Sequence, residues 1–540
     1  MLKLVLGASG SGKTTLLYAR IRARAEAGKR SILLVPEQFT SSTEARIYRE
    51  LGDALSGMVE SYSFTSLAEH ILAALGGAAV QTLTDAGRAV LVRRALEELQ
   101  DNVHYYYRHR RSAAFCQMAA ETIDELKSAG LSGQQLQELA RDCGTESAKL
   151  GELALIFQGY ESLLAGTGMD PADRLELAAD RLEAALARDE LPDFLREREV
   201  FIDEFDTFNA PKKRLMGAML AALPAVTVAL CEDGAPMQPG DLELFSGAKQ
   251  VAAQLRQLAR KNGAQVAAPE LLRRDLRHKD APGLAALTEL LETGSCTPPE
   301  SAPELRLFAA ASREEEARCA AAAIRRLMRQ GVRCGKIAVV CRDISLYRAA
   351  VRYEFRMAEI PLYCDEPTTP EFSAPATAVR ALLALLRGAD MTEQLTVLAK
   401  TGLCALTEPE VCALENYAYT WSPNAAAWRA EFTKSPRGFG DAELTEEDAR
   451  NLTRAEHARK KLVTAVDTLR GKVRSANAEQ ISRALYFCLK ELGAEEQQAA
   501  QVEDIRTARG IPAAEEAARE WNVVMQLLDE MARLLGSQGI

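Results

Sequence analysis

The chain opens with short apolar runs that alternate with one amphipathic segment. Lys3 to Leu6 lead into a glycine-rich stretch, Leu16 to Glu26 follow a helical pattern that stops at Gly28, and Ser31 to Val35 form a second apolar run that ends at Pro36. This order of strand, loop, helix and strand predicts a parallel βαβ unit. The expected fold class is therefore α/β.

Helical periodicity dominates residues 83–191, where glycine-containing breaks separate the segments. Apolar strands resume at Val200–Ile202 and Val226–Leu230. The pattern predicts that one sheet is interrupted and then rejoined. We expect a first α/β core made of residues 1–82 and 192–293, with an all-helical insertion between its two parts.

A stretch rich in proline, serine and threonine marks a linker at residues 294–304. After it come a strand pattern at Leu305–Ala309, a helix pattern at Arg313–Arg329 and a strand pattern at Ile337–Cys341. These segments predict the start of a second α/β core. We expect it to cover residues 305–373, with a second helical insertion over 374–540.

Composition narrows the class of protein. The chain is 47% hydrophobic and 26% charged and has no apolar run of about 18 residues, so we expect a soluble, cytoplasmic protein without a membrane segment. The net charge of −10 argues against coating nucleic acid through the overall field. A local basic surface remains open at His104–Arg111, where tyrosines adjoin cations; a solvated helix end explains this stretch equally well.

The cysteines and histidines form no metal-ligand spacing. All 11 cysteines are scattered singly and the five histidines are far apart. Cys231, Cys341 and Cys488 lie inside apolar patterns, which favours free core thiols. We expect no metal cluster held by residues of this chain.

The glycine-rich stretch fits G-x-x-x-x-G-K-[ST] between a strand and a helix, as a phosphate-binding P-loop requires. Its glycines permit a tight turn whose backbone N–H groups converge on phosphate oxygens. Lys13 is expected to neutralise the β- and γ-phosphates of ATP and Thr14 to bind Mg²⁺. The predicted ATP-binding residues are Gly7, Ala8, Ser9, Gly10, Ser11, Gly12, Lys13 and Thr14.

Two acids follow the apolar strand Val200–Ile202. At the carboxyl edge of a parallel sheet, Asp203 is expected to serve Mg²⁺ and Glu204 to polarise the attacking water. Arg342 follows the predicted strand Ile337–Cys341, from which it could reach a γ-phosphate across the two cores; a surface arginine at a strand end is an equally good interpretation.

Several segments resemble superfamily 1 helicases, and more specifically the B subunit of AddAB-type ATP-dependent helicase–deoxyribonucleases. Ile32–Thr40 with Thr43-Glu44 resembles the first DNA-contacting motif of that protein, and Ser61–Ala68 resembles the next. Further resemblances lie at Arg313–Ala317, Ile337–Asp343, Lys400–Leu403 and Leu414–Tyr417.

The resemblance implies a RecA-like helicase core with large helical insertions, in a heterodimer with an A subunit. Such complexes process double-strand DNA ends for homologous recombination repair, and their B subunit ends in a nuclease with an iron–sulfur cluster. The late helicase motifs, the nuclease acids and the cluster cysteines are expected beyond Ile540, so the second core would be incomplete here. The predicted DNA contacts are Gln38, Phe39, Thr40, Tyr62 and Phe64.

One departure from the family pattern concerns the nucleotide site. Relatives tend to carry a glycine after the strand aspartate, where this chain has Glu204. We expect an ATP-binding, DNA-binding helicase subunit that hydrolyses ATP weakly as an isolated chain and has no nuclease activity. A non-hydrolysing DNA-end scaffold stiffened by ATP and, less favoured, a P-loop small-molecule kinase are the alternatives.

Overall fold

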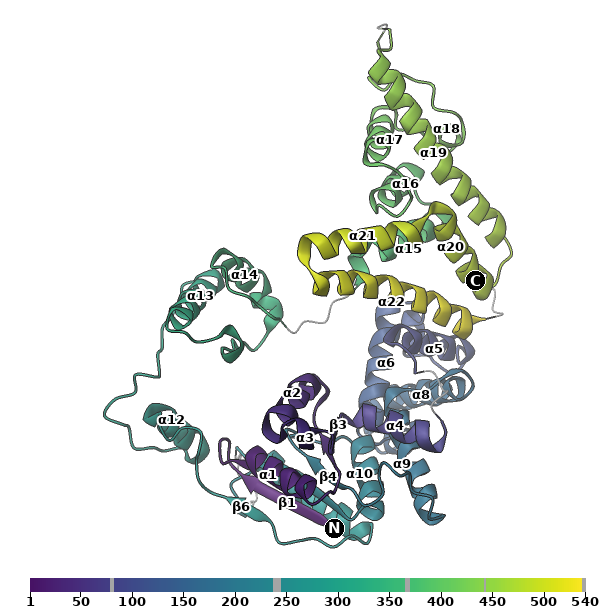
Figure 1. Cartoon of the computed structure of the whole chain (residues 1–540). Helices are drawn as coiled ribbons and strands as arrows, with labels where there is room; N and C mark the ends of the chain where they lie inside the picture. The colour runs from purple at the N-terminus through teal and green to yellow at the C-terminus, as the bar shows by residue number, and fades with distance from the viewer. Residues whose placement is uncertain (78–81, 237–243, 365–369, 441–442, 537–540) are drawn as a thin grey trace.

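The computed structural model describes residues 1–77, 82–236, 244–364, 370–440 and 443–536. A parallel sheet with the order β3-β2-β4-β5-β1-β6 forms its N-terminal part (Figure 1). The strands are β1 (Leu2–Gly7), β2 (Ser31–Leu34), β3 (Val59–Tyr62), β4 (Glu199–Ile202), β5 (Ala225–Cys231) and β6 (Glu270–Leu272).

Helices account for most of the remaining chain. Those of the N-terminal half are α1 (Lys13–Glu26), α2 (Thr40–Leu51), α3 (Asp53–Ser56), α4 (Phe64–Leu75), α5 (Asp85–Glu98), α6 (Ala113–Ser128), α7 (Gly133–Ala140), α8 (Ser147–Thr167), α9 (Pro171–Ala187), α10 (Ala210–Ala222), α11 (Ser246–Lys261) and α12 (Pro282–Thr293). Those that follow are α13 (Arg313–Arg329), α14 (Ile344–Met357), α15 (Ala374–Leu386), α16 (Met391–Lys400), α17 (Glu408–Trp421), α18 (Ala425–Arg429), α19 (Glu446–Val473), α20 (Ala478–Leu492), α21 (Ala494–Arg509) and α22 (Ile511–Leu535).

Helices cover both faces of the sheet, which explains why its central strands are apolar throughout. One face packs against α4, α9, α10 and α11, and the other against α1 and α2. A parallel strand buried on both sides has no solvent face, so it reads as a continuous apolar run. The predicted βαβ unit and the predicted return of the sheet at Val200–Ile202 and Val226–Leu230 are confirmed as β1, α1, β2, β4 and β5.

Two strands were not predicted. β3 has the sequence VESY, in which Glu60 interrupts the apolar pattern, and β6 is only three residues long. Both lie at the edges of the sheet. An edge strand has one hydrogen-bonded neighbour and needs less apolar surface, so its sequence carries a weaker signal.

The helices of residues 85–167, which lie in the region predicted to be helical, form a separate apolar core. Leu91 of α5, Ile123 of α6 and Phe157 of α8 meet in it. Ser and Thr side chains cap the amino ends of α5, α6 and α7 by accepting hydrogen bonds from the N–H groups of the first turn. The neighbouring α9 instead packs Leu175 and Leu182 against the sheet.

The two strands predicted for a second core are not formed. Leu305–Ala309 and Ile337–Cys341 pair with no strand among the described residues, whereas the helix predicted between them is present as α13. Leu307 and Val340 are almost fully exposed. An extended segment becomes a strand only where a neighbour accepts and donates its backbone hydrogen bonds, and the sequence pattern does not specify that neighbour.

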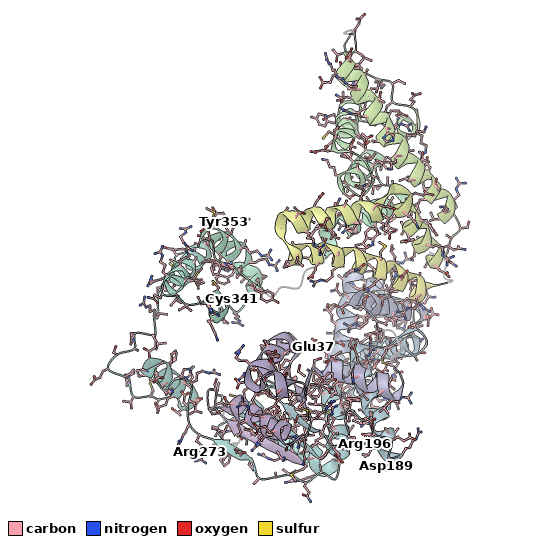
Figure 2. All side chains as sticks on the ribbon, in the orientation of Figure 1. Glu37, Asp189, Arg196, Arg273, Cys341 and Tyr353 are labelled. Carbon is pink, nitrogen blue, oxygen red and sulfur yellow. The ribbon has the colours of Figure 1, made fainter. Side chains whose placement is uncertain are left out.

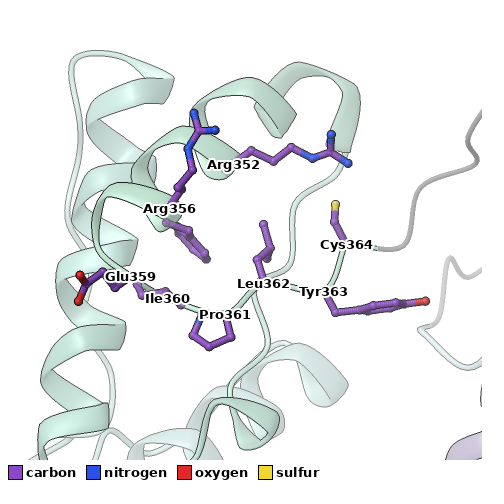
Figure 3. A pocket seen from close by; sticks show the side chains of 9 residues that line it. Arg352, Arg356, Glu359, Ile360, Pro361, Leu362, Tyr363 and Cys364 are labelled. Carbon is purple, nitrogen blue, oxygen red and sulfur yellow. The ribbon is translucent and has the colours of Figure 1, made fainter. Parts of the chain in front are cut away.

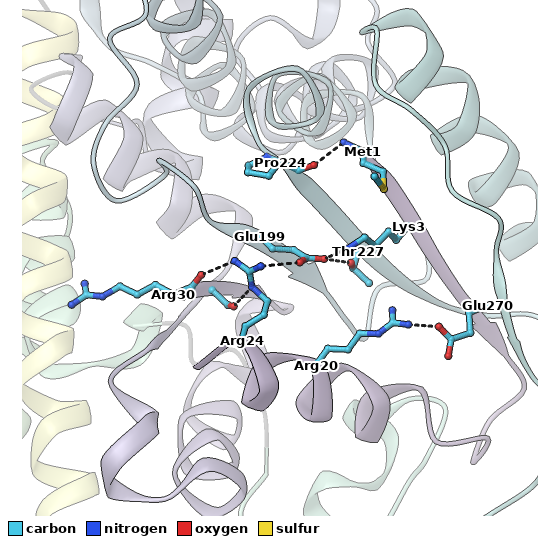
Figure 4. Close-up of polar contacts among 10 residues, drawn as sticks. Met1, Lys3, Arg20, Arg24, Arg30, Glu199, Pro224, Thr227 and Glu270 are labelled. Carbon is cyan, nitrogen blue, oxygen red and sulfur yellow. Dashed lines mark hydrogen bonds and ion pairs between the residues drawn. The ribbon is translucent and has the colours of Figure 1, made fainter. Parts of the chain in front are cut away.

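A buried carboxylate ties the sheet together at the amino ends of its strands (Figure 4). Glu199 of β4 accepts hydrogen bonds from Lys3 of β1 at 2.8 Å and from Thr227 of β5 at 2.9 Å, and Arg24 of α1 lies 3.3 Å away. Burial alone would raise the pKa of Glu199, but these donors hold it below its ordinary value. The contact fixes β4 between segments that are distant in the sequence.

The last helix joins the two helical parts of the chain (Figure 1). Glu530 of α22 accepts hydrogen bonds from the Thr84 N–H at 3.0 Å and from the Thr84 hydroxyl, at the amino end of α5. Leu534 of α22 is buried in the same apolar core as α5, and Arg94 of α5 donates to its carbonyl at 2.8 Å. α22 therefore completes a core that begins more than four hundred residues earlier in the chain.

We expect Glu530→Ala to lower the free energy of unfolding by about 1–3 kcal/mol, because it removes a buried carboxylate that accepts two hydrogen bonds from Thr84. Urea unfolding, together with hydrogen exchange of the α5 amides, measures the change. Glu515→Ala, an exposed site on the same helix, is the matched control and should change stability by less than about 0.5 kcal/mol. Equal effects of the two variants would contradict a stabilising role for this contact.

Candidate functional site

The glycine-rich loop connects the carboxyl end of β1 to the amino end of α1. Gly10 and Gly12 have φ of 79° and 92°, a region that side chains with a Cβ rarely adopt. A Cβ on Gly7 would lie 2.4 Å from the Ser11 hydroxyl and 2.7 Å from the Leu272 carbonyl oxygen. The loop is therefore a tight turn whose backbone is accessible at the start of a helix, the arrangement that binds phosphate.

Lys13 folds back over this loop. Its Nζ donates to the carbonyl oxygens of Gly7 at 2.7 Å and Ala8 at 2.8 Å. Burial lowers the pKa of Lys13 from its ordinary value. The nearby Ser11 hydroxyl is buried and has no hydrogen-bond partner among the described residues. A half-buried ammonium and an unsatisfied hydroxyl in one loop fit an anionic ligand that would engage both.

The two acids after β4 lie beside the loop. Asp203 is 5% exposed, and its N–H donates to the Leu34 carbonyl at 3.1 Å, while the Glu204 N–H donates to an Asp203 carboxylate oxygen at 3.0 Å. Glu204 has a φ of 65°, an uncommon backbone conformation for a non-glycine residue. The turn presents the Asp203 and Glu204 carboxylates to the space above the loop.

Burial sets the electrostatics of this pair. It raises the pKa of Asp203, against the smaller effect of a hydrogen bond with Thr14, and it raises the pKa of Glu204, which the neighbouring Asp203 raises further. The link between Thr14 and Asp203 brings together two oxygen ligands of the kind that Mg²⁺ prefers. These residues therefore fit a Mg²⁺ ion shared with phosphate oxygens.

The loop and the acids line one pocket with a volume of about 530 Å³. Two arginines also line it, neither of which the sequence analysis identified: Arg46 of α2, and Arg277 from the segment after β6. The Leu276 N–H donates to the Gly10 carbonyl at 3.0 Å, and Arg277 donates to the Ser9 hydroxyl at 3.2 Å. No motif marks these arginines, and only the packing of their segments brings them to the loop.

The predicted DNA-contacting residues fall into two environments. Gln38 and Phe39 are exposed and half-buried Thr40 adjoins them, in a short 3₁₀ turn and the first residue of α2, close to Glu37 in Figure 2. Tyr62 is half-buried and its hydroxyl donates to Glu60 at 2.8 Å. Phe64 is 2% exposed and packs on the rings of Phe205 and Phe208. A side chain so deeply buried cannot stack on a base in this arrangement.

Arg342 is exposed and does not line the P-loop pocket. It adjoins Cys341, which lies in the region of α13 and α14 (Figure 2). That region has its own pocket of about 580 Å³, lined by arginines and apolar side chains that include Arg356 and Tyr363 (Figure 3). The described residues therefore place Arg46 and Arg277 at the P-loop, and not Arg342.

The stretch His104–Arg111 binds the carboxylate of Glu152 through its backbone. Glu152 accepts hydrogen bonds from the N–H groups of His104, Tyr105 and Tyr106 at 2.7 to 3.1 Å. Tyr105 is exposed, whereas Tyr106 packs against Phe115. These three backbone donors are thus satisfied within the chain, and Arg108, His109 and Arg111 are exposed.

Within the described parts of the chain, no group of three or more His, Cys, Asp or Glu side chains could hold a metal ion. Cys488 is buried, as are Cys116 and Cys404, and Cys231 and Cys341 are partly buried. None of the described helices is both long and apolar enough to cross a membrane.

Comparison with known proteins gives one family and several relatives that share one name. Residues 4–288 match the family described as ADDB, N-terminal. The B subunits of the ATP-dependent helicase/deoxyribonuclease from Moorella thermoacetica and Desulforudis audaxviator are 30% and 29% identical over the whole chain, which covers 48% of each. The protein of the same name from Clostridium acetobutylicum is 24% identical, with 47% of its length covered.

The chain spans about half the length of these relatives. The match to the family covers more than half of the chain and contains both the glycine-rich loop and the acid pair. We conclude that the chain belongs to the AddB family, whose N-terminal region it matches.

Proposed function

We propose that the P-loop pocket binds Mg²⁺-ATP and that the chain is the ATP- and DNA-binding, helicase-like part of its subunit. The observation that carries the proposal is the convergence of Lys13 and Thr14 with Asp203 and Glu204 in one pocket. The two pairs come from segments nearly 190 residues apart in the sequence. Such a combination of a phosphate loop, a hydroxyl and two acids at one sheet edge suits phosphoryl transfer to water.

Each residue has a distinct task in this scheme. The loop N–H groups bind phosphate oxygens, and Lys13 exchanges the Gly7 and Ala8 carbonyls for the β- and γ-phosphates. Thr14 and Asp203 would hold Mg²⁺, which would supply positive charge against the phosphates. Glu204 orients the attacking water. Arg277 adds positive charge above the loop.

Each relative is named as one subunit of an enzyme, which supports the presence of a partner subunit. We propose that this partner is the A subunit of a heterodimer that processes double-strand DNA ends for homologous recombination repair. The exposed segment Gln38–Thr40 is the proposed contact with single-stranded DNA. Its Phe39 offers a ring that can stack on a base irrespective of sequence. Tyr62 remains a secondary candidate, and Phe64 is left out because it is buried.

Lys13→Ala should weaken ATP binding at least tenfold, because it removes the cation expected to face the phosphates. Fluorescent-nucleotide titration of the whole chain measures the affinity, and Lys29→Ala, an exposed lysine after α1, is the matched control. ATP affinity that is unchanged in Lys13→Ala would refute the proposed site. Hydrolysis by the parent that single-stranded DNA stimulates supports a motor, whereas binding without hydrolysis supports a nucleotide-stiffened scaffold.

Asp203→Asn should abolish the Mg²⁺-dependent part of ATP affinity and yet stabilise the ligand-free chain at neutral pH. Burial raises the pKa of Asp203, so the folded state binds its proton more tightly than the unfolded state does. The ionised carboxylate therefore costs stability once the pH exceeds its raised pKa.

The stability difference between Asp203→Asn and the parent should grow as the pH rises from the ordinary range of an aspartic acid through the raised pKa, and vanish below that range. Urea unfolding in EDTA across this pH series measures it. A variant less stable than the parent at neutral pH would show that the Asp203 carboxylate contributes more through hydrogen bonds than burial costs.

Phe39→Ala should weaken single-stranded DNA binding by about 1–3 kcal/mol, the usual contribution of one stacked base. Fluorescence anisotropy with a labelled oligonucleotide measures this loss. Phe439→Ala, which removes an exposed ring far along the chain, is the control. Equal affinities for the parent and Phe39→Ala would remove this segment from the DNA contact.

A further inference from the structure

Arg46 is a cation of the P-loop pocket that no motif assigns. It lies on α2 and lines the pocket together with Lys13, Asp203 and Glu204. Its guanidinium carbon lies 4.9 Å from the centre of the Tyr18 ring on α1, and Tyr18 is itself buried. The ring supports the guanidinium on one side through a cation–π contact, which limits where its N–H groups can point.

The guanidinium keeps its donors available. Among the residues that the structure describes, no carboxylate forms an ion pair with Arg46 and no acceptor takes a hydrogen bond from it. Its charge nevertheless acts on the pocket, because it lowers the pKa of both Asp203 and Glu204 against the larger effect of burial. An arginine that has planar, unused donors at the rim of a phosphate pocket is suited to bind a phosphate group.

Geometry selects the terminal phosphate as its ligand. In the proposed site the loop N–H groups hold the inner phosphates, and Thr14 and Asp203 would hold the Mg²⁺ that neutralises charge on the outer ones. The γ-phosphate then lies on the side of the acid pair. Arg46 lines the same pocket as both acids. A diphosphate would leave this part of the pocket empty.

The helix that carries Arg46 begins at the proposed DNA contact. Arg46 follows Thr40 by six residues, which is about 9 Å along an α-helix. The Thr40 hydroxyl donates to the Glu37 carbonyl at 2.9 Å, and the Ser42 hydroxyl donates to the Phe39 carbonyl at 2.8 Å. These bonds join the exposed turn to the first residues of α2.

We propose that Arg46 binds the γ-phosphate, makes the pocket prefer a nucleoside triphosphate to a diphosphate, and transmits this difference through α2 to the segment Gln38–Thr40. The inference rests on the proposed nucleotide site and adds a specificity-determining residue to it. By linkage, a triphosphate that draws Arg46 and α2 toward the pocket must alter DNA affinity by the same factor by which DNA alters triphosphate affinity.

The test compares the Mg²⁺ complexes of ATPγS and ADP in equilibrium titrations of the whole chain. Arg46→Met should weaken ATPγS binding roughly tenfold or more and ADP binding by less than about twofold, because only the triphosphate loses a charge-assisted contact. Arg46→Lys, which keeps the charge but loses the planar donors, should fall between the parent and Arg46→Met. Arg49→Met, on the same helix but outside the pocket, is the matched control and should leave both affinities unchanged.

A second measurement addresses the coupling to DNA. The ratio of single-stranded DNA affinities measured with ATPγS and with ADP should differ from one in the parent and approach one in Arg46→Met. Thermal unfolding of each variant checks the fold, and Arg46→Lys replaces Arg46→Met if loss of the contact with Tyr18 unfolds the chain.

The outcomes separate this inference from the function on which it rests. A parent that binds neither nucleotide, or binds them independently of Lys13, overturns the proposed site itself. A parent that binds through Lys13 while Arg46→Met loses both nucleotides equally, or neither, overturns only the role of Arg46. A selective loss of ATPγS, with loss of the DNA ratio, supports the inference.

Discussion

The pairing of β4 between β2 and β5 is the interaction on which the rest of the structure depends. It aligns Ile202 with Leu34 on one side and with Val228 on the other, although the helices α5 to α9 separate β4 from β2 in the chain. Parallel pairing brings the carboxyl ends of these strands to one edge. Without it, Asp203 and Glu204 would not lie beside the phosphate loop.

The P-loop pocket is assembled at an energetic cost. It buries Asp203 and half-buries Lys13, and at neutral pH burial opposes the charged form of both. Lys13 offsets part of this cost with two backbone carbonyls, and Asp203 does so with the Glu204 N–H. The buried Ser11 hydroxyl still has no hydrogen-bond partner among the described residues, so the groups of the chain do not satisfy the pocket fully.

The apolar cores of the structure do not follow the domain boundaries that the sequence pattern predicts. α9 packs on the sheet, and α22 completes the core formed by α5, α6 and α8 through Leu534 and Glu530. An apolar helix face packs against the core that it complements, even when that core is formed by segments distant in the sequence. Segments whose partners are absent among the described residues, such as Leu305–Ala309, keep an apolar pattern without becoming strands.

The sequence by itself determined the local chemistry: the P-loop with its glycines, Lys13 and Thr14, the apolar strand before Asp203, and the helices with clear caps and periodicity. These features depend on neighbours a few residues away, so a linear pattern records them. Tertiary structure alone decided that Arg46 and Arg277 reach the pocket while Arg342 does not, and that Phe64 is buried. The physical reason is that these outcomes depend on how helices and strands distant in the sequence pack together, which no local spacing encodes.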